Sequence, residues 1–204
     1  MGHLRSSTLL LLLLACHAQH SAASLTINRA TSIPLRRTRP MLRKAGWIFT
    51  YSDVRPLNLS SPQSVAFLAT NLAFAATGAA IGTSGSDPLL GCLVELAGVA
   101  SVYYHSAQCA FGGTSRPVVQ FAMLVDYLVA LPTLLTGVLY AAELPAEALP
   151  AHAVALALAS FAALVGGWFW TGPQQYMLIH GLWHVLVAAA GYDLALAHAA
   201  LAIT

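Results

Sequence analysis

The stretch "LIHGLWHVLVAA", residues 178–189, lies in the last strongly apolar segment of the chain and carries two histidines. His180 and His184 are four residues apart, a spacing that places both imidazoles on one face of a helix, one turn apart. Such a pair can hold one metal ion, pack as two hydrogen-bonded core histidines, or contact a cofactor. Which of these applies depends on the polar residues elsewhere in the chain.

The composition indicates an integral membrane protein. Of the 204 residues, 58% are apolar and only 8% are charged, whereas about a quarter of the residues of a soluble domain are charged. Eight of the nine Lys and Arg residues lie at or before Arg55, and one base and six acids follow it. Because the basic residues lie in a terminal segment and not on a folded face, nucleic-acid binding is not expected.

The N-terminal region resembles two targeting signals in series. Residues 1–23 contain Arg5, a short apolar run "TLLLLLLAC" and a small-residue exit, as in a secretory signal peptide. Residues 24–50 are rich in Arg, Ser and Thr and contain no acid, which is typical of a transit peptide or a basic, disordered segment. A bipartite leader of this kind predicts a plastid membrane in an alga of secondary endosymbiotic origin. The alternative is an ordinary signal peptide and a basic tail, with residence in the endoplasmic reticulum or Golgi membrane.

After residue 61 the chain divides into five apolar segments, each near the roughly 20 residues that a membrane-spanning helix needs. The expected spans are 62–82, 88–110, 117–141, 150–170 and 174–200. Each begins beside a proline, which is tolerated in the first helical turn because its missing N–H would have no partner there. Pro132 falls inside the third span and is expected to kink it. The sequence therefore predicts an all-α, polytopic transmembrane bundle over residues 62–204.

Five polar residues from three of these spans are expected at one depth in the membrane. His105 lies near the end of the second span, Asp126 near the start of the third, and His180 and His184 near the start of the fifth. These positions share one side of the membrane and lie roughly 7 to 15 Å deep, at about 1.5 Å per helical residue. Ser101 precedes His105 by one turn. Ionisable groups inside a membrane are costly, so a cluster at one depth predicts a functional site.

The sidedness follows from the charges that flank the spans. Arg55 and Arg116 lie on the side where the histidines are expected, whereas Asp87, Glu143 and Glu147 lie on the other. By the positive-inside rule, the histidine side faces the cytosol, or the stroma in a plastid membrane.

Three neutral imidazoles with a fourth position left open for water are the layout of a catalytic zinc site. Zn²⁺ lowers the pKa of a bound water and polarises a carbonyl, and a nearby carboxylate can accept the proton. Two alternatives remain: zinc that only ties the helices together, with the site closed, and haem. His180 and His184 project from one helix and cannot be opposite axial ligands, so haem would need His105.

The motifs "SVYYH" (101–105), "LVDYL" (124–128) and "HGLWH" (180–184) resemble the signature of the CREST superfamily over roughly residues 62–200. This superfamily contains alkaline ceramidases, adiponectin and progestin receptors and myomaker-related proteins, and the chain is most similar to the last branch. The resemblance implies that three histidines bind zinc, and that the aspartate and serine assist at the bound water. In this chain these residues are His105, His180, His184, Asp126 and Ser101.

The family typically has seven spans, whereas five are expected here. Loss of an adjacent pair of helices between Asp126 and His180 would preserve the sidedness of the site. The resemblance implies a zinc-dependent hydrolase acting on an amide or ester bond of a membrane lipid such as ceramide. The alternative is a non-catalytic receptor or membrane-remodelling protein with a structural zinc. Glu95, Tyr104 and Trp183 are further candidates for lining a substrate cavity.

Overall fold

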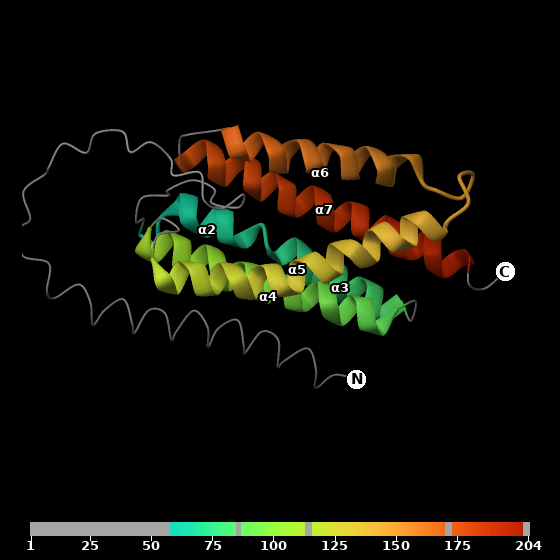
Figure 1. Ribbon diagram of the computed structural model, residues 1–204, viewed down its shortest axis with the longest axis horizontal. Helices are drawn as coiled ribbons and strands as arrows, with labels where there is room; N and C mark the ends of the chain where they lie inside the picture. Colours follow the sequence, from blue (N-terminus) through green and yellow to red (C-terminus); the bar gives the residue numbers. More distant parts are fainter. Residues whose placement is uncertain (1–57, 85–86, 113–115, 170–172, 202–204) are drawn as a thin grey trace, which may run out of the picture. The chain divides into compact units, whose positions relative to one another are not determined.

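The computed structural model describes residues 58–84, 87–112, 116–169 and 173–201, and no strand occurs among them. The all-α prediction is confirmed. The helices are α2 (Pro62–Ala69), α3 (Leu72–Ser84), α4 (Pro88–Phe111), α5 (Pro117–Glu143), α6 (Ala151–Phe169) and α7 (Pro173–Leu201) (Figure 1). The signal and transit interpretations of residues 1–23 and 24–50 concern a part of the chain outside the described residues.

Four helical segments in the described ranges are long and apolar enough to cross a membrane. They are Pro62–Ser84, Pro88–Phe111, Pro117–Glu143 and Pro173–Leu201. The fourth expected span, 150–170, corresponds to α6, whose apolar part, Ala151–Gly167, is shorter than the other four segments. At about 1.5 Å per residue, the 19 residues of α6 extend about 28 Å, close to the roughly 30 Å thickness of a bilayer core.

The prolines lie at helix starts, as their spacing predicts. Pro62 follows Ser61, whose hydroxyl accepts a hydrogen bond from the Ser64 N–H at 3.2 Å. Pro88 follows Asp87, whose carboxylate accepts from the Leu90 N–H at 2.9 Å. These side chains satisfy backbone donors that have no partner within the helix.

The third expected span forms α5, which contains Pro132. As predicted, this helix bends along its length (Figure 1). Proline removes one backbone hydrogen bond from a helix and bends it. Beyond the bend, the second half of α5 runs toward α7.

The first expected span, 62–82, is not one continuous helix, because it breaks at Thr70 and Asn71. The Thr70 hydroxyl donates to the Phe67 carbonyl at 2.6 Å, and the buried Asn71 amide donates to the Leu68 carbonyl at 3.1 Å. Threonine and asparagine side chains that bond to nearby carbonyls in this way compete with the helical pattern. The break separates α2 from α3 and leaves Thr70 facing α7.

The helix α3 packs against both α4 and α7, while α6 packs only against α7 among the described helices. Close approach of α3 to α4 depends on two glycines. A Cβ atom on Gly91 would lie 2.7 Å from the Gly78 carbonyl oxygen, which is too near for any side chain. Small residues of this kind allow membrane helices to pack with their backbones in contact.

At the membrane end opposite the three histidines, polar contacts join α4, α5, α6 and α7. These contacts are Tyr140–Asp87, His198–Glu143 at 2.8 Å and His152–Asp193 at 3.1 Å. Asp193, which belongs to the last span, therefore has a structural partner.

Candidate metal centre

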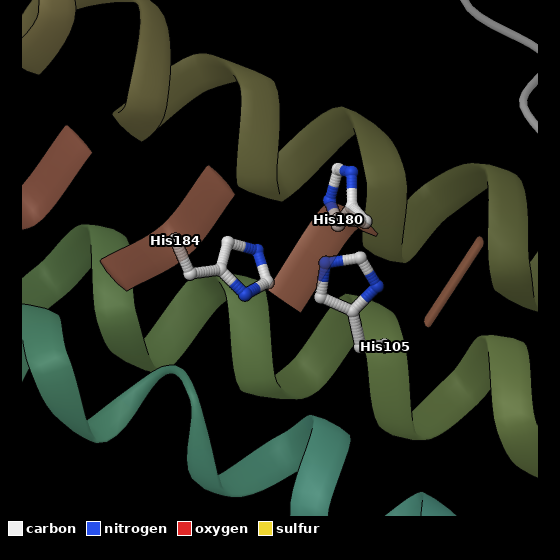
Figure 2. A group of neighbouring side chains, drawn as sticks. All are labelled: His105, His180 and His184. Carbon is white, nitrogen blue, oxygen red and sulfur yellow. The ribbon is translucent and has the colours of Figure 1, made fainter. Parts of the chain in front are cut away.

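The imidazoles of His105, His180 and His184 converge in the interior of the bundle (Figure 2). His105 projects from α4, and the other two project from successive turns of α7. The ring centroids are 4.9 Å apart for His105 and His180, 5.1 Å for His105 and His184, and 4.8 Å for His180 and His184. One nitrogen from each ring lies within 4.8 Å of the others. The predicted meeting of the three histidines is confirmed, and the group can hold a metal ion.

The three rings are buried and lie beside aromatic side chains. His105 and His184 are 1% and 0% exposed. The centroid of the Phe67 ring lies 4.7 Å from that of His105 and 6.0 Å from that of His184. The Tyr176 ring stacks on His180 with 5.0 Å between centroids. Within the described structure, His105 Nε2 is buried and has no hydrogen-bond partner. A buried polar atom without a partner is destabilising, and three imidazole nitrogens are a ligand set that suits Zn²⁺.

The helices that supply the ligands meet through side chains such as Ser101 and His184, while their backbones stay apart. No Cα atom of α4 lies within 8 Å of a Cα atom of α7 in the described helices, and α3 contacts both. A metal ion held by His105, His180 and His184 would therefore link α4 directly to α7.

Two side chains that the sequence analysis did not select bond to ring nitrogens of the histidines. Thr70 Oγ1 lies 2.9 Å from His184 Nδ1, and Gln108 Oε1 lies 3.0 Å from His105 Nδ1. Gln108 follows His105 by three residues on one helix face, a spacing that could have identified it. No local pattern indicates Thr70, which is 114 residues from its partner.

Ser101 and Asp126 are buried and line one small cavity together with Trp183. The cavity measures about 30 Å³, which is enough for a water molecule, since one needs about 10–15 Å³ of such volume. Ser101 Oγ also lies 3.5 Å from His184 Nε2. Ser101 and Trp183 therefore contact the histidine cluster, and Asp126 shares the cavity with both of them.

The two other candidate cavity residues lie elsewhere. Tyr104 packs in a core cluster between α4 and α5 that includes Val119 and Met123. The side chain of Glu95 lies against Gly78 of α3. Neither residue lines the cavity that contains Ser101.

A larger groove of about 470 Å³ runs between α2 and α7. Gln63 and Gln174 line it at the beginnings of these helices, and Thr70 and Gly181 line it deeper in the membrane. Between them the lining is apolar and includes Phe67, which is 3% exposed and contacts the histidines. Phe67 therefore separates the groove from the three imidazoles.

No protein-family model, curated protein or solved structure matches this chain. Its function has to be inferred from the residues at this site. They combine three convergent imidazoles, a buried serine and carboxylate beside them, and an apolar groove behind one aromatic side chain.

Proposed function

We propose that the protein is a zinc-dependent membrane hydrolase of the CREST type that cleaves an amide or ester bond in an acyl lipid such as ceramide. The observation that carries the proposal is the proximity of Ser101 and Asp126 to three convergent histidines inside an apolar bundle. Burying several ionisable groups at this depth in the membrane is costly, so such a cluster indicates a functional site.

The proposed chemistry divides between the ion and the side chains. When bound to His105, His180 and His184, zinc would lower the pKa of a water molecule and polarise a carbonyl oxygen. Among the described residues that line the cavity with Ser101, Asp126 is the only carboxylate, so it is assigned the proton released by the water. Ser101 is assigned a hydrogen bond to the oxygen on which negative charge develops.

The groove between α2 and α7 supports an acyl lipid as substrate. Its volume of about 470 Å³ lies within the roughly 300–1,000 Å³ range of small-molecule sites. Glutamines line the end expected near the membrane surface, and apolar side chains line the remainder. We assign an acyl chain to this groove, with its carbonyl at the Phe67 end, nearest the histidines.

One observation favours a structural metal instead. The cavity at Ser101 and Asp126 measures only about 30 Å³, which leaves room for a water molecule but not for a lipid beside it. In this second candidate function, zinc ties α4 to α7 in a receptor or membrane-remodelling protein, and Phe67 keeps the site closed.

The test measures zinc content and release of fatty acid from ceramides and related acyl lipids. Asp126→Asn should retain zinc and lose most activity, because an amide cannot accept the proton. Ser101→Ala should retain zinc and lose about 10²–10³-fold in kcat or less, the range for removal of one transition-state hydrogen bond. Thr133→Val is the matched control, because Thr133 lines the same cavity but bonds to its own helix at Val129.

Unchanged activity in Asp126→Asn would refute the proposed proton acceptor. A fully zinc-loaded wild type that hydrolyses no lipid of the panel would favour the structural role.

The leader sequence supports a plastid membrane as the site of action. We expect a fluorescent fusion of residues 1–60 to reach plastids in an algal host. Arrest of the fusion in the endoplasmic reticulum would support the signal peptide and contradict the transit peptide.

A further inference from the structure

Thr70 lies in the break between α2 and α3, and its hydroxyl is within hydrogen-bonding distance of two groups. Its Oγ1 lies 2.6 Å from the Phe67 carbonyl oxygen and 2.9 Å from His184 Nδ1. A hydroxyl carries one hydrogen and can accept through its lone pairs. Because the carbonyl can only accept, the hydroxyl hydrogen goes to Phe67, and the Thr70 oxygen accepts from the ring of His184.

This arrangement defines the tautomer of His184. The ring carries its hydrogen on Nδ1, so that Nε2 keeps its lone pair and faces Ser101 and the other histidines. Gln108 acts in the same way on His105, since its Oε1 accepts from Nδ1 at 3.0 Å. His105 Nε2 is then the nitrogen left buried and without a partner in the described structure.

We propose that Thr70 is a positioning residue that presents Nε2 of His184 to the metal, and that the break in the first span exists to hold its hydroxyl there. The inference rests on the metal-binding part of the proposed function and not on hydrolysis. Partners that bind the second nitrogen of a ligating histidine fix its tautomer and orientation, and their loss typically weakens metal affinity 10- to 100-fold.

The experiment compares zinc affinity of the full-length protein in lipid nanodiscs, measured by competition with a chelator. Thr70→Val keeps the side-chain shape but cannot accept from Nδ1, so its zinc affinity should fall about 10- to 100-fold. Thr70→Ser retains the hydroxyl and should restore the wild-type affinity. Thr77→Val is the matched control, because Thr77 also joins the first span to α7, through the Ala188 carbonyl at 3.4 Å, without touching a histidine.

A second measurement does not require zinc. In metal-free protein labelled with ¹⁵N-histidine, NMR should show His184 as the Nδ1–H tautomer in the wild type, in Thr70→Ser and in Thr77→Val. In Thr70→Val the Nε2–H form should appear. This signature separates positioning from a general loss of stability, which would not change the tautomer in a folded protein.

Equal zinc affinity in folded Thr70→Val and in the wild type would overturn the inference, and so would an unchanged His184 tautomer. If Thr70→Val loses affinity while the wild type binds zinc and hydrolyses no lipid, the inference holds and the hydrolase proposal fails. A wild type that binds no zinc would overturn both.

Discussion

Zinc should raise the melting temperature of the metal-free protein, and replacing any one of His105, His180 and His184 with alanine should abolish that rise. The physical reason is that the ligands come from two helices that lie far apart in the sequence. Since His105 lies on α4 and His180 and His184 lie on α7, the three ligands meet only when these two helices are packed in the folded bundle. The unfolded bundle does not hold the ligands in this arrangement.

The magnitude follows from mass action. A ligand that binds only the folded state stabilises it by RT ln(1 + [L]/Kd), about 2.7 kcal/mol at about 100 times Kd and about 4.1 kcal/mol at about 1,000 times Kd. For a protein of this size, 1 kcal/mol shifts the melting temperature by about 2–4 °C. Zinc at about 1,000 times its Kd should therefore raise the melting temperature by about 8–16 °C.

The assay follows tryptophan fluorescence on heating, with chelator present and then with zinc added. His105 is 1% exposed, so His105→Ala also leaves a cavity and lowers the metal-free melting temperature. The diagnostic quantity is therefore the shift that zinc produces within each variant. His152→Ala is the control, because its imidazole is exposed and pairs with Asp193 away from the centre.

A zinc-induced shift in His105→Ala equal to that of the wild type would refute the reasoning. So would a wild type whose melting temperature does not respond to zinc.

Two further predictions concern the groove and the opposite end of the bundle. Ala66→Trp should fill the groove that Ala66 lines and lower kcat/KM at least about 10-fold, with zinc content unchanged. Ala69→Trp, on the same helix but outside that lining, should leave kcat/KM unchanged. Equal activities of the two variants would show that the substrate does not use the groove. Asp87→Ala should lower the free energy of unfolding in SDS by about 1 kcal/mol at neutral pH through loss of the helix cap, whereas Asp87→Asn should retain most of it. Partial burial acts to raise the pKa of Asp87, but hydrogen bonds from the Leu90 N–H and Tyr140 outweigh it and hold the pKa below its ordinary value. The carboxylate therefore stabilises the fold above the unfolded-state pKa of about 4. The difference in the free energy of unfolding between wild type and Asp87→Ala should narrow as the pH falls through the lower folded-state pKa. A difference that does not depend on pH would contradict this prediction.

The convergence of the three histidines could be predicted because a membrane limits where a residue can lie. Prolines define the helix starts, and each helical residue advances about 1.5 Å, so His105, His180 and His184 share one depth before any contact is known. The i, i+4 spacing on α7 then gives two ligands on one face. Depth and face were sufficient to predict this part of the site.

The break at Thr70 could not be predicted in the same way. The segment 62–82 is apolar enough to span the membrane as one helix, and threonine and asparagine are common in helices that remain continuous. The break is stabilised by bonds to the Phe67 and Leu68 carbonyls and by the contact with His184, which depends on tertiary packing. Sequence spacing along one helix carries no information about such a distant partner.

The two sides of the histidine cluster differ in chemistry, and this difference bears on the choice between enzyme and structural site. On one side lie Ser101 and Asp126, with a cavity the size of a water molecule. On the other side Phe67 closes an apolar groove of about 470 Å³. In the proposed hydrolase, water and its proton acceptor would therefore belong to the first side, and a lipid carbonyl would arrive from the second. A hydrolase consequently requires the Phe67 side chain to move during turnover, whereas a structural zinc site requires it to remain where it is.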